Sequence, residues 1–458
     1  MPPITRQLAQ HLARVTYADL PAATVRAAKR SLLDAIGVSL GASGLEAACA
    51  PFSELAAQAP GPCQVLGYGA RAMPLMAACA NGALAHALDY EDAYDGTPAH
   101  PNAACVPVVL ALAERDASID GQSVLLALAA GCDVVCRLAL ALEQNPDRHG
   151  FYPPPILGAF GAAASAAKLL ALDEERIVAA FGLTLSQAMC SSQFKHDADS
   201  SLRAVRDAFA AHAGLLAAEL AARNVRAFEA AFEGEFGMYA LFARGAYEPE
   251  RLLAGLGTQF LGERVSYKPW PSCRGTHAFV EAALRMHEQH GVSPDDIAMV
   301  VARGSALQRM LAEPLARKQA PRTAIDAKFS VPYCVALALS RGAVTLDGFS
   351  PEALGDPRVI ELARRVSFVA DSDSDLRDGV SGSLELHVHT GQIHRLRIDP
   401  PLGHPDQPLD DAQLVAKFVD CAQRAACPLG ADAARAAATE LFRLEHVASA
   451  RDSFALLG

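Results

Sequence analysis

A succession of alanine- and leucine-rich stretches fills the first half of the chain, with apolar residues three and four positions apart. This spacing is the period of an α-helix that buries one face, and alanine favours both helix formation and close helix packing. Short Gly, Pro or Asp signals separate the stretches. The stretches predict consecutive helices over residues 23–40, 73–88, 104–115, 122–142, 156–171, 176–190 and 202–223. Consecutive helices in this number predict an all-α domain.

The pattern changes after about residue 262. Short β-branched or alternating segments predict strands at 297–302 and 365–369, and a hairpin of 383–389 and 393–398 that turns at Thr390 and Gly391. Helical stretches accompany them at 273–287 and 330–340, and further helices follow at 410–426 and 431–444. This alternation predicts a smaller α/β region followed by a return to helix.

The expected fold is therefore mainly α. A large helical domain is built from both ends of the chain, residues 1–262 and 405–458, and residues 263–404 form an inserted, smaller α/β lid domain. With 51% hydrophobic and 20% charged residues among 458, the chain has the composition of a protein with a large buried core.

Charge and cysteine content exclude several classes. The net charge of −11 argues against nucleic-acid binding, which needs a basic surface. The eleven cysteines are scattered without CxxC spacing, which favours a reduced, cytoplasmic protein. The first fifteen residues lack the apolar core of a signal peptide. Asp133 and Arg137 interrupt the most apolar stretch, 123–142, so no membrane span is expected.

The densest group of reactive side chains lies in residues 86–101, where Gly96, Pro98 and Pro101 predict an irregular loop between two helices. Buried charge is costly, so such a density indicates either an active site or a solvated acidic loop, and both interpretations stay open here. The group holds two histidines and four acids: His86, Asp89, Glu91, Asp92, Asp95 and His100.

Four further groups combine basic, aromatic or imidazole side chains, and each also has a plain structural explanation. The prolines after Tyr152 begin a helix that offers an anion site or merely an ordinary helix start. The bases of 195–206 would grip a carboxylate or form surface ion pairs. The plain explanation of the group at 267–277 is a domain linker, and that of the group at 328–333 is ordinary core packing. Their members include Tyr152; Lys195, Arg203 and Arg206; Lys268, Arg274 and His277; and Lys328 and Tyr333.

Other sites are not expected. His387, His389 and His394 have the residue type of a metal site, but no cysteine or carboxylate supports them, so an exposed hairpin is favoured and no metal is predicted. The glycine-rich signatures of dinucleotide, P-loop and hydrolase sites do not occur in a strand-to-helix setting.

Several stretches, taken in order, resemble the MmgE/PrpD family, which includes 2-methylcitrate dehydratase, cis-aconitate decarboxylase and iminodisuccinate epimerase. No single stretch is diagnostic, but the ordered set is specific and covers nearly the whole chain. The stretches are 32–38, 81–101, 154–172, 210–218, 268–277, 326–333 and 403–418.

The resemblance implies a homodimer without metal or organic cofactor, whose active site lies between the helical domain and the lid. It implies catalytic roles for Asp89, His100, Tyr152 and His277, with His100 or His277 as base and Asp89 orienting an imidazole. It also implies a substrate-binding role for Tyr333. The family's lysine matches Arg203 by position or Lys195 by residue type. From their charge, Lys268, Arg274 and Arg203 would hold carboxylates.

Departures from the family pattern point to a different substrate. Ala93 stands where a threonine is usual, Tyr152 where histidine is common, and Arg203 where lysine is common. The expected function is a lyase, a dehydratase or decarboxylase that removes a proton next to a carboxylate of a small di- or tricarboxylate other than methylcitrate or cis-aconitate. The alternatives are a two-base epimerase or isomerase of an iminodisuccinate-like diacid and a non-catalytic member that binds a small acid.

Overall fold

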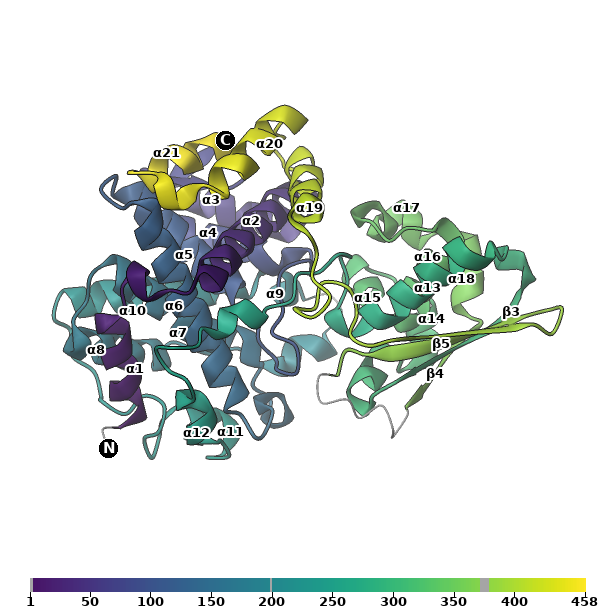
Figure 1. Ribbon diagram of the computed structural model, residues 1–458, viewed down its shortest axis with the longest axis horizontal. Helices are drawn as coiled ribbons and strands as arrows, with labels where there is room; N and C mark the ends of the chain where they lie inside the picture. Colours follow the sequence, from purple (N-terminus) through teal and green to yellow (C-terminus); the bar gives the residue numbers. More distant parts are fainter. Residues whose placement is uncertain (1–2, 198–199, 371–378) are drawn as a thin grey trace. The chain divides into compact units, whose positions relative to one another are not determined.

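The computed structural model describes residues 3–197, 200–370 and 379–458. The chain divides into two compact units, one formed by Met1–Val265 with Asp410–Gly458 and the other by Ser266–Leu409 (Figure 1). Helices dominate, and the strands form only small sheets. The prediction of a mainly α fold with a small α/β portion is confirmed.

The first unit is built around five helices that pack on one another. Their alanines and leucines are buried on nearly all sides, because small side chains let a helix approach several neighbours at once. Gly82 shows how close the approach is: a Cβ there would lie 2.7 Å from the carbonyl oxygen of Asp207. The helices are α4 (Pro74–Ala87), α5 (Asn102–Arg115), α6 (Gly121–Leu140), α7 (Pro153–Leu169) and α10 (Asp207–Ala222).

The C-terminal segment completes this unit. Helix α19 (Asp411–Gln423) packs along α2 (Ala22–Leu45), and Figure 1 shows the two side by side. Gly37 permits the contact, since a Cβ at this position would lie 2.9 Å from the ring of Phe418. Helices α20 (Ala431–Leu441) and α21 (Ala450–Phe454) follow. Both ends of the chain therefore share one core.

Helix α6 bears on the prediction that no segment spans a membrane. Its length and mean hydropathy of 1.9 would allow it to cross a membrane, despite Asp133 and Arg137, but 83% of its apolar window is buried inside the protein. Arg137 is fully buried and donates from Nε to Asp133 at 2.6 Å. A mostly buried helix with an internal ion pair is typical of a protein core. Helices Ala22–Leu45 and Ala47–Ala57 pass the same test only together, and they are bent by 97°.

The second unit is a four-stranded sheet in the order β4-β3-β5-β6. The central strand β3 (Ile297–Gly304) pairs in parallel with β4 (Val366–Ala370) and antiparallel with β5 (Gly382–Val388), which continues into β6 (Ile393–Ile398). Helices α13 (His277–His290) and α16 (Val331–Arg341) pack against each other and against the sheet. All strands and helices predicted for this region occur, with ends shifted by a few residues.

Two helices of the first unit differ from the prediction. The stretch 202–223 divides at Arg206 into α9 (Leu202–Val205) and α10, and α8 (Glu174–Leu185) ends before the predicted end at residue 190, with Met189 beyond it 60% exposed. The sequence analysis missed the shorter elements. They are α1 (Ile4–Arg14), α3 (Ala50–Ala57), β1 (Cys63–Val65), β2 (Ala70–Ala72), α11 (Met238–Ala243), α12 (Pro249–Leu253), α14 (Leu315–Gln319), α15 (Ala324–Lys328), α17 (Pro351–Leu354) and α18 (Pro357–Ala363).

Candidate active site

One carboxylate joins two imidazoles after helix α4. Glu91 is fully buried, and its Oε1 lies 2.5 Å from Nδ1 of His86 and 3.0 Å from Nδ1 of His100. The rings of the two histidines are 5.7 Å apart. Burial excludes the solvated-loop interpretation, because His86, Asp89, Glu91 and Asp92 are each at most 2% exposed. The acidic loop is therefore part of the interior.

The hydrogen bonds of His100 define its tautomer. Nδ1 lies 2.6 Å from the carbonyl oxygen of Asp92. A carbonyl oxygen only accepts hydrogen bonds, so Nδ1 must carry the proton, and in the neutral ring Nε2 holds the lone pair. The side chain of Asp92 meanwhile accepts from the backbone N–H of Asn102 at 3.3 Å. This loop thus presents His100 as a base through Nε2.

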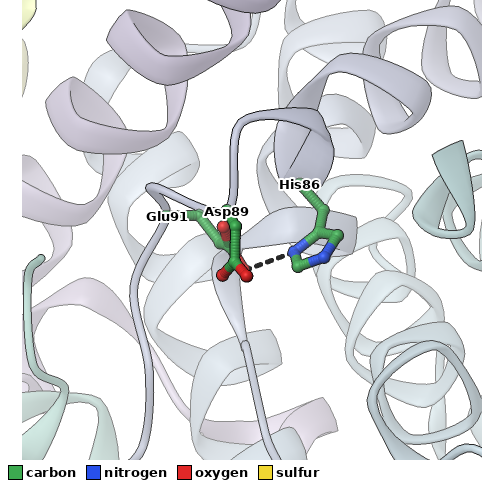
Figure 2. A group of neighbouring side chains, drawn as sticks. All are labelled: His86, Asp89 and Glu91. Atoms are coloured by element: carbon green, nitrogen blue, oxygen red, sulfur yellow. Dashed lines mark hydrogen bonds and ion pairs between the residues drawn. The ribbon is translucent and has the colours of Figure 1, made fainter. Parts of the chain in front are cut away.

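Asp89 has an unusual backbone conformation and belongs to a group of possible metal ligands. Asp89 has a φ of 51°, a left-handed conformation that a residue other than glycine adopts at a cost. His86, Asp89 and Glu91 offer ligand atoms that all lie within 4.8 Å of one another, as a divalent cation would require (Figure 2). Within residues 3–197, 200–370 and 379–458, these three form the group able to hold a metal. The bond from His86 to Glu91 drawn in Figure 2 already uses one of those oxygens.

A buried arginine supplies positive charge next to these acids. Arg206 is 1% exposed, and its charge and those of Glu91 and Asp89 act on one another. Burial by itself lowers the pKa of Arg206, but Tyr152 and the nearby carboxylates raise it by more. The pKa is therefore raised overall, and the guanidinium stays charged. Burial, followed by the charge of Arg206, lowers the pKa of His86 to about 3, which keeps this imidazole neutral.

Asp207 begins helix α10 directly after Arg206. Its Oδ2 lies 3.5 Å from Nε of Arg206, and burial raises its pKa to about 6 despite this neighbour. Gly82 in α4 lets the start of α10 come within van der Waals distance. That contact places both residues beside the end of the helix that carries His86.

Tyr152 lies among cations. It caps the start of α7, and its ring centroid is 4.7 Å from Nζ of Lys195 and 5.1 Å from the guanidinium carbon of Arg206. The Phe194 ring packs on it edge-on at 4.9 Å. Nζ of Lys195 also lies 2.5 Å from Asp147, and burial lowers the pKa of Lys195 although Asp147 opposes this.

Arg203 differs from Arg206 in its surroundings. Its guanidinium carbon lies 5.7 Å from the ring of Phe194, and its side chain is half-buried. The two candidates for the family's lysine, Lys195 and Arg203, therefore both border the ring pair of Tyr152 and Phe194. The fully buried position belongs to Arg206, which the sequence analysis grouped with them without assigning it a role.

In the second unit, His277 has both ring nitrogens engaged. Nδ1 lies 3.2 Å from Nη1 of Arg274, and Nε2 lies 3.2 Å from the carbonyl oxygen of Ser272. Because a guanidinium only donates, Nδ1 accepts and Nε2 donates. The ring packs edge-on against Trp270 at 5.3 Å, and Lys268 is fully buried in the same segment.

Besides its contact with His277, Arg274 donates to the backbone of its own unit. It donates from Nη1 to the carbonyl oxygen of Leu402 at 2.9 Å and from Nη2 to that of Pro401 at 3.4 Å. Tyr333 is likewise buried, and its hydroxyl lies 2.8 Å from the carbonyl oxygen of Gly348. Lys328 lies 5.7 Å from the ring of Phe349. These contacts give each side chain a structural role in this conformation.

The histidine-bearing hairpin of this unit has no metal-binding group among the described residues. His394 stacks on His290, with ring centroids 3.8 Å apart, and His387 lies 3.5 Å from Glu385. His387 and His394 therefore contact different partners.

The structure brings Asp89 and His100 into one cluster and places Tyr152 and Lys195 beside Arg206. Glu91 contacts both imidazoles, and Glu91, His86 and Arg206 are members of the cluster for which no role was predicted. The available signal was the density of acids around residue 91, but density cannot tell which acid points at which ring.

Fold and site together define a mainly helical protein with a buried imidazole–carboxylate cluster, the equipment of an acid–base enzyme. Comparison with known families agrees. The MmgE/PrpD N-terminal domain matches residues 6–250, and the MmgE/PrpD C-terminal domain matches residues 270–440. The chain belongs to the MmgE/PrpD family, and the prediction of an enzyme of this family is confirmed.

Curated relatives cover most of the chain. A cis-aconitate decarboxylase-like protein of Aspergillus oryzae is 27% identical over 91% of this chain and 89% of its own length. The cis-aconitate decarboxylase of Aspergillus terreus is 26% identical over 91% and 88%, and that of Homo sapiens is 28% identical over 76% and 72%.

Proposed function

We propose that the chain is a lyase, a dehydratase or decarboxylase, that transfers a proton at the carbon next to a carboxylate of a small di- or tricarboxylate, with His100 as the acid–base group. The observation that carries the proposal is the arrangement of His100, whose Nδ1–H is held by the Asp92 carbonyl oxygen and Glu91. Nε2 is thereby fixed as the nitrogen that exchanges a proton.

Glu91 makes His100 a better base. A carboxylate 3.0 Å from Nδ1 stabilises the imidazolium that forms when Nε2 takes a proton. In a dehydration, the electron pair of the broken C–H bond forms the alkene while hydroxide leaves with a proton from an acid. In a decarboxylation, the bond to CO₂ breaks, its electron pair stays on the carbon, and His100 in its protonated form donates the Nε2 proton to that carbon.

The developing negative charge needs cations. In the first unit, Lys195 and Arg203 are the candidates that the family resemblance suggests, and Tyr152 offers a hydroxyl for the second proton transfer. Lys268 and Arg274 remain candidates because of their charge, and His277 and Tyr333 remain candidates from the resemblance. Ala93 and Tyr152 change the chemistry of the presumed pocket, which supports a substrate other than cis-aconitate or methylcitrate.

Proton exchange followed by NMR tests this function. The purified protein is incubated in D₂O with citrate, methylcitrate, cis-aconitate, iminodisuccinate and related hydroxy and imino diacids. Deuterium at the α-carbon together with an alkene product or CO₂ supports the lyase. Deuterium without loss of water or CO₂ indicates an epimerase instead, and no exchange with any compound favours a binding protein.

Two controls sharpen the experiment. His100→Gln is expected to abolish exchange, whereas His446→Gln, at a histidine with a 70% exposed side chain, should keep it. Full turnover by the His100 variant would contradict the mechanism. Repeating the assay after dialysis against EDTA tests the predicted independence of metal. The test is relevant because the ligand atoms of His86, Asp89 and Glu91 lie close enough together to hold a metal ion.

The homodimer and the cytoplasmic location also remain predictions from the family resemblance and the composition. Sedimentation equilibrium of the purified chain measures the first, and fractionation of cells that express it measures the second.

A further inference from the structure

Arg206 is a buried cation with unused donors. It is 1% exposed, and its hydrogen bond to the described residues runs from Nη1 to the carbonyl oxygen of Arg203 at 3.2 Å. Within the described part of the chain, Nε and Nη2 have no hydrogen-bond partner. A buried charged group that leaves donors unsatisfied is costly, so the arrangement calls for a functional explanation.

The two unused nitrogens form one edge of the guanidinium. Nε–H and the N–H groups of Nη2 point in parallel from that edge, which is the fork that matches the two oxygens of a carboxylate. The nearest acid, Asp207, approaches Nε only to 3.5 Å and forms no hydrogen bond with it. Its raised pKa, about 6 because of burial, weakens its competition for the fork as the pH falls toward that value.

The surroundings of Arg206 are those of the acid–base cluster. Its guanidinium carbon lies 5.1 Å from the ring of Tyr152, and its charge acts on His86, Glu91 and Asp89. Arg203 lies against Phe194 at the margin of the same group. A buried cation whose charge acts on the reactive side chains thus has its carboxylate-binding edge unused.

We propose that Arg206 binds a carboxylate of the substrate through Nε and Nη2 and thereby selects carboxylates that bind in a bidentate manner. This assignment rests on the proposed function, because it names the group that holds the acid on which that function acts. Arg203 and Lys195 would then serve a second carboxylate. The preferred ligands are small acids with at least two carboxylates.

Binding and turnover are measured separately to test the assignment. Isothermal titration gives the Kd of citrate, tricarballylate and succinate for the wild type, Arg206→Lys and Arg206→Met. Lysine keeps the charge but lacks the fork, so the Kd of the best-binding acid should rise roughly tenfold in Arg206→Lys and roughly a hundredfold in Arg206→Met. Arg176→Lys, at an exposed arginine of α8, is the matched control.

Turnover provides the second measurement. With any substrate found by deuterium exchange, KM should rise in Arg206→Lys by about the same factor as Kd, with a smaller change in kcat. A purely structural arginine would change the midpoint of unfolding but leave Kd and KM as in the wild type, and that result would overturn the proposal. Should Arg206→Met fail to fold, Arg206→Lys alone decides.

The two proposals fail in different ways. Absence of deuterium exchange, with Kd still sensitive to Arg206, would remove the proposed reaction and leave the carboxylate site intact. Exchange with a KM that does not depend on Arg206 would leave the reaction and remove the site. Absence of saturable binding of every acid to the wild type would also overturn the assignment of Arg206.

Discussion

Lys417 in the C-terminal helix α19 donates from Nζ to the carbonyl oxygen of Tyr90 at 2.7 Å, between Asp89 and Glu91 of the acid–base loop. The same Nζ lies 2.7 Å from Asp34 in α2 and 3.9 Å from the centre of the Tyr90 ring. All three contacts are buried. The end of the chain therefore helps to hold the loop that carries the reactive carboxylates.

Lys417→Met should reduce both stability and activity. Removing one partner of a buried ion pair costs about 3–5 kcal/mol, and the Tyr90 carbonyl loses its donor. Chemical denaturation and the rate of deuterium exchange measure the two effects. Lys29→Met is a matched control, since Lys29 contacts Glu445 at 2.6 Å and the Phe442 carbonyl at 3.0 Å, outside the acid–base loop. This variant should lose stability but keep its activity.

A double variant separates the charge from the positioning. Asp34→Asn with Lys417→Met removes both charges, so most of the stability should return, whereas activity should not, because the hydrogen bond from Lys417 to the Tyr90 carbonyl is still missing. Recovery of full activity in the double variant would contradict a positioning role for Lys417.

Glu91→Gln should slow turnover roughly tenfold to a hundredfold while the protein stays folded. The Asp92 carbonyl would still hold Nδ1–H of His100 at 2.6 Å, but the negative charge that stabilises the imidazolium would be lost. The rate of exchange under substrate saturation measures the loss. Asp95→Asn, in the same loop, is the control, and an equal loss in both variants would argue against a specific role for Glu91.

Glu114 should make stability depend on pH. It is 3% exposed, and burial raises its pKa to about 7, although the Gln64 N–H that it accepts at 2.7 Å opposes this. An acid with a raised folded-state pKa contributes stability below the unfolded value, here 4.5, and loses that contribution as the pH rises through about 7.

Glu114→Gln isolates this effect. The stability of the wild type relative to the variant should fall by about 3 kcal/mol between pH 4.5 and 8. Urea denaturation of both proteins across this range measures it. Glu54→Gln, at an exposed position of α3, should follow the wild type; a constant difference between the wild type and Glu114→Gln would contradict the raised pKa.

Tyr333→Phe decides between two roles for this residue. The family resemblance suggests substrate binding, but the hydroxyl lies 2.8 Å and 3.2 Å from the carbonyl oxygens of Gly348 and Ala353. We therefore expect a loss of about 1 kcal/mol in the free energy of unfolding and an unchanged KM. An increase in KM at unchanged stability would instead support the substrate-binding role.

Much of the fold could be predicted because its signals are local. The three-four spacing of apolar residues gave the helices of both units, and the alternation around Thr390 and Gly391 gave the hairpin. The break at Arg206 and the end of α8 before Met189 were missed. Both depend on which surfaces meet in the folded chain, and the apolar pattern continues across them.

The candidate site could be predicted as a set of residues but not as an arrangement. The loop of 86–101 was identified by the density of its acids and histidines, and Asp89 and His100 do lie in one buried cluster. Which acid contacts the two imidazoles depends on the folded backbone, where Oε1 of Glu91 lies 2.5 Å from Nδ1 of His86 and 3.0 Å from Nδ1 of His100.

The sequence by itself determined the helical class, the order of the family's motifs and the kinds of side chain available for proton transfer, because each is encoded in residue type and spacing. The tertiary structure decided that Arg206 is fully buried, whereas Arg203, three positions earlier, is half-buried. The physical reason is packing between distant segments: Gly82 admits the start of α10 against α4, and the resulting burial sets the charges and pKa values of the cluster.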